Sequence, residues 1–173
     1  MSSNRIYRYY VEGPDEEKLI NVLKSDMKLI YSGRVEVINV VQKKLTELRL
    51  MQLKSNTVVV LIFDTDAGNV EILNYNIKLL NKCQQVKKII CIPQVGNLED
   101  ELIRSCDIRQ IKELLDSQSN KDFKHDLIKE KNLALKLQGK NFDINRLWSN
   151  NPSNQYKDVK NNSREILVPE AGK

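Results

Sequence analysis

The chain has 173 residues, which fits one domain of ordinary size with a hydrophobic core of its own. Hydrophobic residues make up 40% of it and charged residues 29%, a composition that excludes fibrous and wholly disordered proteins. Lys and Arg number 28 against 23 Asp and Glu, and the net charge of +5 mildly favours polyanionic partners. Most of this excess lies in residues 121–173, which hold 11 basic and 7 acidic residues.

Several classes of protein are disfavoured by single features of the sequence. No run of about 18 apolar residues occurs, so we expect no membrane-spanning segment. Three cysteines without a CxxC pair argue against a disulfide framework or a cysteine-rich zinc site. His125 is the only histidine, which argues against histidine-based zinc hydrolases. With no secretory core at the start of the sequence, we expect a cytoplasmic protein.

The first part of the chain predicts alternating strands and helices. Runs of β-branched and aromatic residues predict strands at 6–11, 35–41, 57–63 and 88–92. Apolar residues at helical spacing predict helices between them, at 14–30, 41–51 and 70–80. This alternation predicts right-handed crossovers and an α/β fold, with a central parallel sheet of about four strands flanked by helices. The uninterrupted apolar run 58–63 fits a strand buried on both faces.

Beyond Pro93 the pattern predicts helices only, at 98–104, 109–115, 121–137 and 144–148. Residues 149–163 are rich in Asn, Ser and Lys and poor in apolar side chains, which is typical of a mobile segment. We therefore divide the chain into three parts. They are a core at 1–105, a helical extension packed on it at 106–148, and a flexible polar tail at 149–173.

Acidic residues follow three of the predicted strands, where the carboxyl ends of parallel strands meet at one edge of the sheet. They are Glu12, Asp15 and Glu16 after the first strand, Asp64 and Asp66 after the third, and Glu99 and Asp100 after the fourth. Carboxylates that converge in this way repel one another unless a cation neutralises them. In the absence of clustered His or Cys, such oxygen ligands select Mg²⁺ or Mn²⁺. An ion of this kind suits the transfer or hydrolysis of a phosphate group.

Each acidic cluster taken alone also has an ordinary explanation. A DxD sequence at a strand end is common, and acidic residues at the start of a helix, such as Glu99, are favoured by the helix dipole. The inference of a metal site therefore depends on three clusters coinciding at one edge.

The motifs Val11-Glu12-Gly13 and Asp64-Thr65-Asp66, in this order and strand context, resemble the TOPRIM domain of topoisomerases, primases and several nucleases. The resemblance covers residues 5–105 and implies a Rossmann-like TOPRIM fold. The motif Glu12-Gly-Pro-x-Glu16 has a second acid four residues after the first. In this respect it resembles the nuclease branch of the TOPRIM proteins. That branch includes the overcoming-lysogenization-defect (OLD) nucleases and small TOPRIM proteins of bacterial anti-phage systems.

The resemblance implies catalytic roles for Glu12, Asp64, Asp66 and Glu99. It implies two Mg²⁺ or Mn²⁺ ions, held by these four residues together with Glu16, and Asp100 is the alternative to Glu99. A basic residue near the scissile phosphate is also implied, and the sequence does not choose among Lys124, Lys131, Lys136 and Lys140. The sequence shows no topoisomerase tyrosine domain, no primase zinc segment and no ATPase domain, so an ATPase would come from a separate subunit.

The expected function is therefore two-metal hydrolysis of phosphodiester bonds in DNA or RNA. One alternative is primase-like nucleotidyl transfer by the same carboxylates. Another is a non-catalytic subunit that binds nucleic acid or a partner ATPase. A flavodoxin-like regulator with a phosphoacceptor aspartate is disfavoured, because it does not account for the Glu12-Gly-Pro turn.

Overall fold

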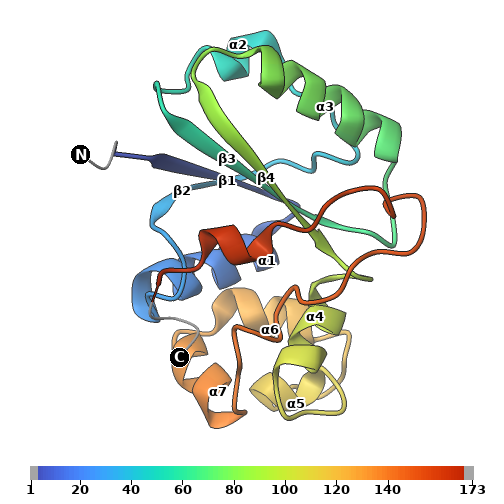
Figure 1. Ribbon diagram of the computed structural model, residues 1–173. Coiled ribbons are helices and arrows are strands. Elements are labelled where there is room, and N and C mark those ends of the chain that lie inside the picture. The colour runs from blue at the N-terminus through green and yellow to red at the C-terminus, as the bar shows by residue number, and fades with distance from the viewer. Residues whose placement is uncertain (1–3, 170–173) are drawn as a thin grey trace.

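The computed structural model describes residues 4–169 of the chain (Figure 1). Its centre is an all-parallel sheet of four strands in the order β2-β1-β3-β4, which confirms the expected α/β, Rossmann-like arrangement. The strands are β1 (Ile6–Val11), β2 (Gly33–Val37), β3 (Thr57–Asp64) and β4 (Val86–Gln94).

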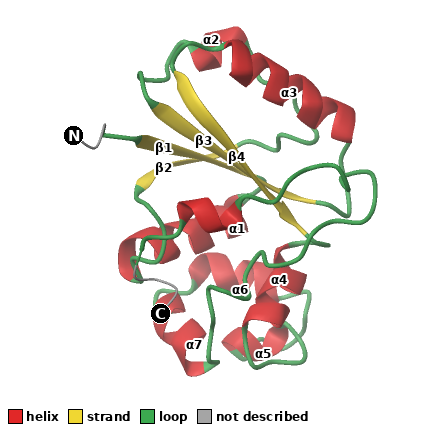
Figure 2. Cartoon of the chain, viewed as in Figure 1, coloured by secondary structure: helices red, strands yellow, loops and turns green. Residues whose placement is uncertain are grey.

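Helices cover both faces of this sheet, α2 and α3 on one face and α1 with α4 to α7 on the other (Figure 2). The α-helices are α1 (Pro14–Asn21), α2 (Glu47–Leu50), α3 (Val70–Lys82), α4 (Leu98–Ser105), α5 (Lys112–Leu115), α6 (Phe123–Lys129) and α7 (Leu133–Gly139). A π-helix, η1 (Val22–Asp26), continues α1, and a 3-10 helix, η2 (Ser163–Ile166), lies near the end of the chain. Within residues 4–169, no helix is both long enough and apolar enough to cross a bilayer.

Strand β3 explains why the fold has two cores. All eight of its residues are buried. Because side chains alternate along a strand, Val58, Val60 and Ile62 pack among α1 and the C-terminal helices. Val59, Leu61 and Phe63 pack on the opposite face, against α3. This double burial is the reason that β3 is an unbroken apolar run in the sequence.

The strand order places the topological switch point of the sheet between β1 and β3. From β1 the chain crosses to β2 on one side, and it then returns to place β3 on the other side of β1. The connections that leave β1 and β3 therefore diverge on opposite sides of the carboxyl ends of these strands. In open parallel sheets this switch point is where ligands bind.

The predicted helix at 41–51 is wrong, because only α2 is helical there. The apolar stripe misled the prediction, since Leu48 and Met51 are 71% and 75% exposed. The buried Asn76 of α3 instead fixes this segment as a loop, since its side chain accepts from Leu45 N (2.7 Å) and donates to the carbonyl oxygens of Val40 and Lys43. Strand β2 also ends at Val37, short of the predicted 41.

Two further helix predictions are wrong. The helix predicted at 121–137 is divided into α6 and α7, because Glu130 adopts an extended conformation and its side chain accepts from Asn132 N. The helix predicted at 144–148 is a turn, which ends at the buried Trp148 with φ of +55°.

The segment expected to be a flexible tail is packed on the core up to residue 169. Tyr156 and Ile166 are fully buried, one in each core. Leu167 forms an antiparallel bridge with Ile30. The segment is polar in composition, but these isolated apolar side chains anchor it. Residues 170–173 lie outside the described residues.

Candidate metal centre

Asp64 lies at the carboxyl end of β3, at this switch point, and is only 8% exposed. Its carboxylate accepts from Gln94 Nε2 at 2.6 Å, and its backbone N–H donates to Glu12 Oε2 at 2.9 Å. Burial, and then the negative charge of Glu12, raise the pKa of Asp64 to about 8, and Asp66 and Glu99 act in the same direction. All four predicted catalytic acids therefore lie close enough to interact.

The turn from β1 into α1 brings two more carboxylates to this place. Gly13 is extended and Pro14 occupies the first helical turn, where its missing N–H costs nothing. Asp15 and Glu16 follow, and both are buried. A Cβ on Gly13 would meet Asp15 Oδ1 at 2.9 Å and Glu16 Oε2 at 3.2 Å, so glycine leaves the space that these carboxylates need. Burial, and then the adjacent Asp15, raise the pKa of Glu16.

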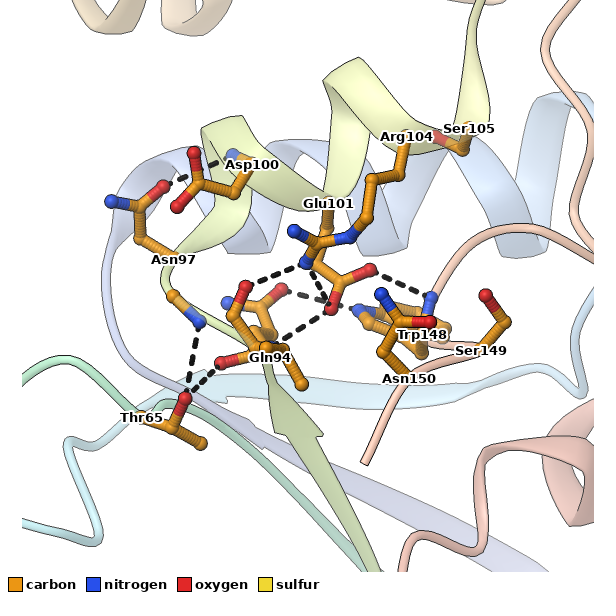
Figure 3. Close-up of polar contacts among 12 residues, drawn as sticks. Thr65, Gln94, Asn97, Asp100, Glu101, Arg104, Ser105, Trp148, Ser149 and Asn150 are labelled. Carbon is orange, nitrogen blue, oxygen red and sulfur yellow. Dashed lines mark hydrogen bonds and ion pairs between the residues drawn. The ribbon is translucent and has the colours of Figure 1, made fainter. Parts of the chain in front are cut away.

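Hydrogen bonds tie the loop after β3 to the loop after β4. Gly96 O accepts from the backbone N–H groups of Thr65 (3.0 Å) and Asp66 (3.2 Å). Thr65 Oγ1 donates to Gln94 O at 2.8 Å and accepts from Gly96 N (Figure 3). The exposed Asp66 accepts from Asn97 Nδ2 at 3.2 Å. These bonds fix the path of the Asp64-Thr65-Asp66 motif.

Glu99 and Lys124 complete the cluster. Lys124, on α6, places Nζ 3.4 Å from Glu99 Oε1 and 3.7 Å from Asp15 Oδ2. It arrives there because α6 packs against α1. Burial lowers the pKa of Lys124, but the charges of Glu99 and Asp15 raise it by more, so the net pKa is raised and the ammonium form persists.

The structure thus distinguishes among the four candidate lysines. Lys136 lies 3.9 Å from Asp116, and Lys131 lies in the connection between α6 and α7. Lys140 follows α7, where its carbonyl accepts from Asp107 N. Only Lys124 among these four forms ion pairs with the acidic cluster.

Asp100, the alternative to Glu99, has a different environment. Its backbone N–H donates to the Asn97 side chain at the start of α4. Its carboxylate lies against the Cα of Gly96, in the space that a Cβ on that glycine would occupy. Glu99, and not Asp100, forms an ion pair with Lys124.

Three buried carboxylate oxygens of the cluster have no hydrogen-bond partner within the described part of the chain. They are Asp15 Oδ2, whose one cationic neighbour among the described residues is Lys124 Nζ at 3.7 Å, Glu16 Oε2 and Glu99 Oε2. A buried acceptor that is left unpaired costs about 1–3 kcal/mol, and a bound cation would remove this cost. Across residues 4–169, no three Asp, Glu, His or Cys side chains are arranged to hold an ion as they stand. The donor set is nevertheless made of hard oxygens, which fits Mg²⁺ or Mn²⁺.

Sequence reasoning did not assign Asp15, Gln94 or the segment 154–156 to the site. Asp15 is adjacent to Glu16 in the first helical turn, and Gln94 is the register partner of Asp64 at the ends of two parallel strands. Both positions follow from the motifs already recognised, so they were accessible to prediction.

The segment 154–156 gave no comparable signal. It holds the loop that follows Asp64. Asn154 Nδ2 donates to Thr65 O at 2.6 Å, and the Tyr156 hydroxyl donates to Ala67 O at 2.7 Å. Gln155 Nε2 adds a bond to Gly68 O at 3.3 Å. Residues far along the chain thereby fix the loop that carries Asp66.

Comparison of the chain with protein-family models, with curated proteins and with solved structures finds no match. The functional assignment therefore depends on the residues of the site.

Proposed function

We propose that this protein is a Mg²⁺- or Mn²⁺-dependent nuclease that hydrolyses phosphodiester bonds, with a core of the TOPRIM type. One observation carries the proposal. Carboxylates from the ends of β1 and β3 and from the starts of α1 and α4 converge at the switch point of the sheet, with a single lysine among them. Side chains gathered in this way from separate elements are typical of a functional site.

We assign these residues to two ions by the elements from which they come. Glu12, Asp64 and Asp66 come from the strand ends, whereas Glu16 and Glu99 come from the first turns of two helices, next to Asp15. Bound divalent ions supply charge neutralisation for the phosphate and a lowered pKa for an attacking water.

In this proposal, side chains of the protein orient the metal ligands and stabilise the charge on the phosphate. Gln94 orients Asp64 by donating to Oδ1, and its own Oε1 accepts from Trp148 Nε1 at 3.2 Å. The Lys124 ammonium lies among the acids, where it stabilises negative charge that develops on the phosphate oxygens. Asp64, whose pKa is raised to about 8, must lose its proton when a cation binds, so metal affinity increases with pH.

The test is a cleavage assay on duplex DNA, single-stranded DNA, transfer RNA and ribosomal RNA, with Mg²⁺, with Mn²⁺ and with a chelator. We expect metal-dependent cleavage by the native chain and none by Asp64→Asn. Asp116→Asn is the matched control, since Asp116 is exposed and its left-handed backbone conformation (φ of 54°) suits asparagine.

Two results would contradict the proposal. One is cleavage by Asp64→Asn at the native rate. The other is a calorimetric titration of the native chain that shows no binding of Mn²⁺. Labelled nucleotides and a primed template, added in parallel, identify nucleotidyl transfer by the lengthening of strands. The separate ATPase subunit stays a prediction, and co-purification with the native chain tests it.

A further inference from the structure

A second charged region lies at the opposite end of the sheet from the acidic cluster. At the amino ends of β1 and β2 there is a cavity of about 470 Å³. Among the described residues that line this cavity none is acidic and four are cationic. They are Arg5, Arg8, Arg34 and Lys54. We call this cavity the basic groove.

The parallel register of β1 and β2 is what brings the guanidinium groups together. Arg8 pairs with Arg34 across the two strands, so both side chains project from the same face. Glu36 is shared among three arginines, at 2.9 Å from Arg8, 3.5 Å from Arg34 and 3.7 Å from Arg49. One carboxylate cannot neutralise three guanidinium groups, and the exposed Arg5 and Lys54 add two more positive charges.

The wall of the groove also carries a guanidinium group that is held in place. The Arg8 side chain is only 13% exposed, and Glu36 fixes it through Nη1. Its Nε atom is buried, and no acceptor within residues 4–169 pairs with it. A guanidinium held in place, with excess positive charge around it, suits the recognition of a phosphate.

We propose that the basic groove binds the phosphodiester backbone of the nucleic acid whose cleavage is proposed above, and this inference rests on that function. Arg8 precedes Glu12 by four residues of an extended strand, about 13 Å along β1, a separation that is within the length of a short oligonucleotide. Interactions of this kind hold the backbone without reading its sequence. The groove thus gives an acidic catalytic site, which repels phosphate, a separate point of attachment.

The test measures the binding of short fluorescein-labelled single-stranded and duplex oligonucleotides by anisotropy, in chelator and on the Asp64→Asn background, at salt concentrations from about 50 to 200 mM. The variant is Arg34→Ala/Lys54→Ala, which alters two exposed side chains. Lys78→Ala/Lys157→Ala removes the same charge from exposed positions elsewhere. We expect the groove variant to bind about tenfold more weakly, and its salt slope to fall by about 0.7–0.9 for each phosphate that the variant no longer neutralises. The control should bind like the parent.

An equal loss of affinity in both double variants would overturn the inference, because only net charge would then matter. Unchanged binding by the groove variant would overturn it as well. So would competition by a mononucleotide at the concentration at which the oligonucleotide binds, since that result assigns the groove to free nucleotides. The native chain could fail to cleave while the groove variant binds the oligonucleotide more weakly than its parent does. That result would contradict the proposed nuclease function and support the basic groove as a binding site. If the native chain cleaves and the groove variant binds with the affinity of its parent, the nuclease function is supported and the binding role of the groove is contradicted.

Discussion

Helix α4 carries two glutamates, two residues apart, whose surroundings differ. Glu101 is fully buried, and each of its oxygens has partners. Oε1 accepts from Val95 N and lies 2.9 Å from the Arg104 guanidinium, and Oε2 accepts from Trp148 N at 2.9 Å (Figure 3). Glu99 has one oxygen 3.4 Å from Lys124 and one buried oxygen without a hydrogen-bond partner among the described residues.

This difference separates an acid that holds the fold together from acids that are available to a ligand. Burial alone does not distinguish them, since Asp15, Glu16 and Asp64 are buried as well. What distinguishes them is the number of donors that reach the carboxylate. Glu101 joins the β4–α4 loop to the segment around Trp148, whereas Glu99 pairs only with Lys124 among the described residues.

The largest expected effect is on the pH dependence of stability in chelator. The pKa of Asp64 is raised to about 8, and that of Glu16 is raised too. Between the ordinary carboxyl pKa of about 4 and about 8, the native state binds protons that the unfolded state has lost. The contribution of these two carboxyl groups to the free energy of unfolding is therefore fully present below about pH 4 and is lost as pH rises to about 8, by at most about 1.4 kcal/mol per pH unit for each proton.

Urea unfolding at a series of pH values measures this slope. Asp64→Asn should flatten it, and Mn²⁺ should restore stability at pH 8 by binding the native state. A slope that Asp64→Asn leaves unchanged would show that other groups cause it.

Glu101→Gln tests the other half of the comparison. The substitution leaves Arg104 without its carboxylate and places an amide in a site built for acceptors. We expect unfolding free energy to fall by about 3 kcal/mol, the low end for buried pairs, because Arg104 is partly exposed. Glu99→Gln is the control and should not destabilise the protein. Equal losses in urea unfolding would contradict the distinction.

Lys124→Ala should reduce the rate of cleavage about tenfold, or about 1.4 kcal/mol in activation free energy, because positive charge beside the phosphate is removed. Metal affinity should stay the same or rise, since a competing cation has been removed from Glu99 and Asp15. Lys140→Ala is the matched control. Single-turnover cleavage and Mn²⁺ titration separate the two effects, and a parallel loss of metal affinity would contradict a role at the phosphate.

The smallest effect is expected for Asp100→Asn. Its carboxylate lies beside Gly96, away from the pair formed by Glu99 and Lys124. Cleavage and Mn²⁺ affinity should change by less than about twofold, or about 0.4 kcal/mol. A loss as large as that of Glu99→Gln would make Asp100 the ligand in its place.

Local signals were enough to predict the strands and the acidic motifs. The run 58–63 could only be a strand buried on both faces, and the ends of parallel strands must meet at one edge, so the positions of Glu12 and Asp64 followed. The wrong predictions had non-local causes. Asn76 fixes residues 40–45 as a loop from another helix, and Tyr156 anchors a segment whose average composition is polar.

The choice of Lys124 could not be made from the sequence for the same reason. All four candidate lysines lie in helices or beside them with similar neighbours, and only the packing of α6 on α1 brings one of them to the acids. Asp15 could be assigned to the site from local information alone, because the first turn of α1 places it next to Glu16.

The bonds from Asn154 and Tyr156 to the β3–α3 loop have a consequence for synthesis on the ribosome. These partners are separated from the loop by 89 residues. A nascent chain can assemble its sheet long before it emerges as far as Tyr156, and until then Thr65 and Ala67 lack these two bonds. These two bonds to the acidic loop can therefore form only after residues 154–156 have been synthesised.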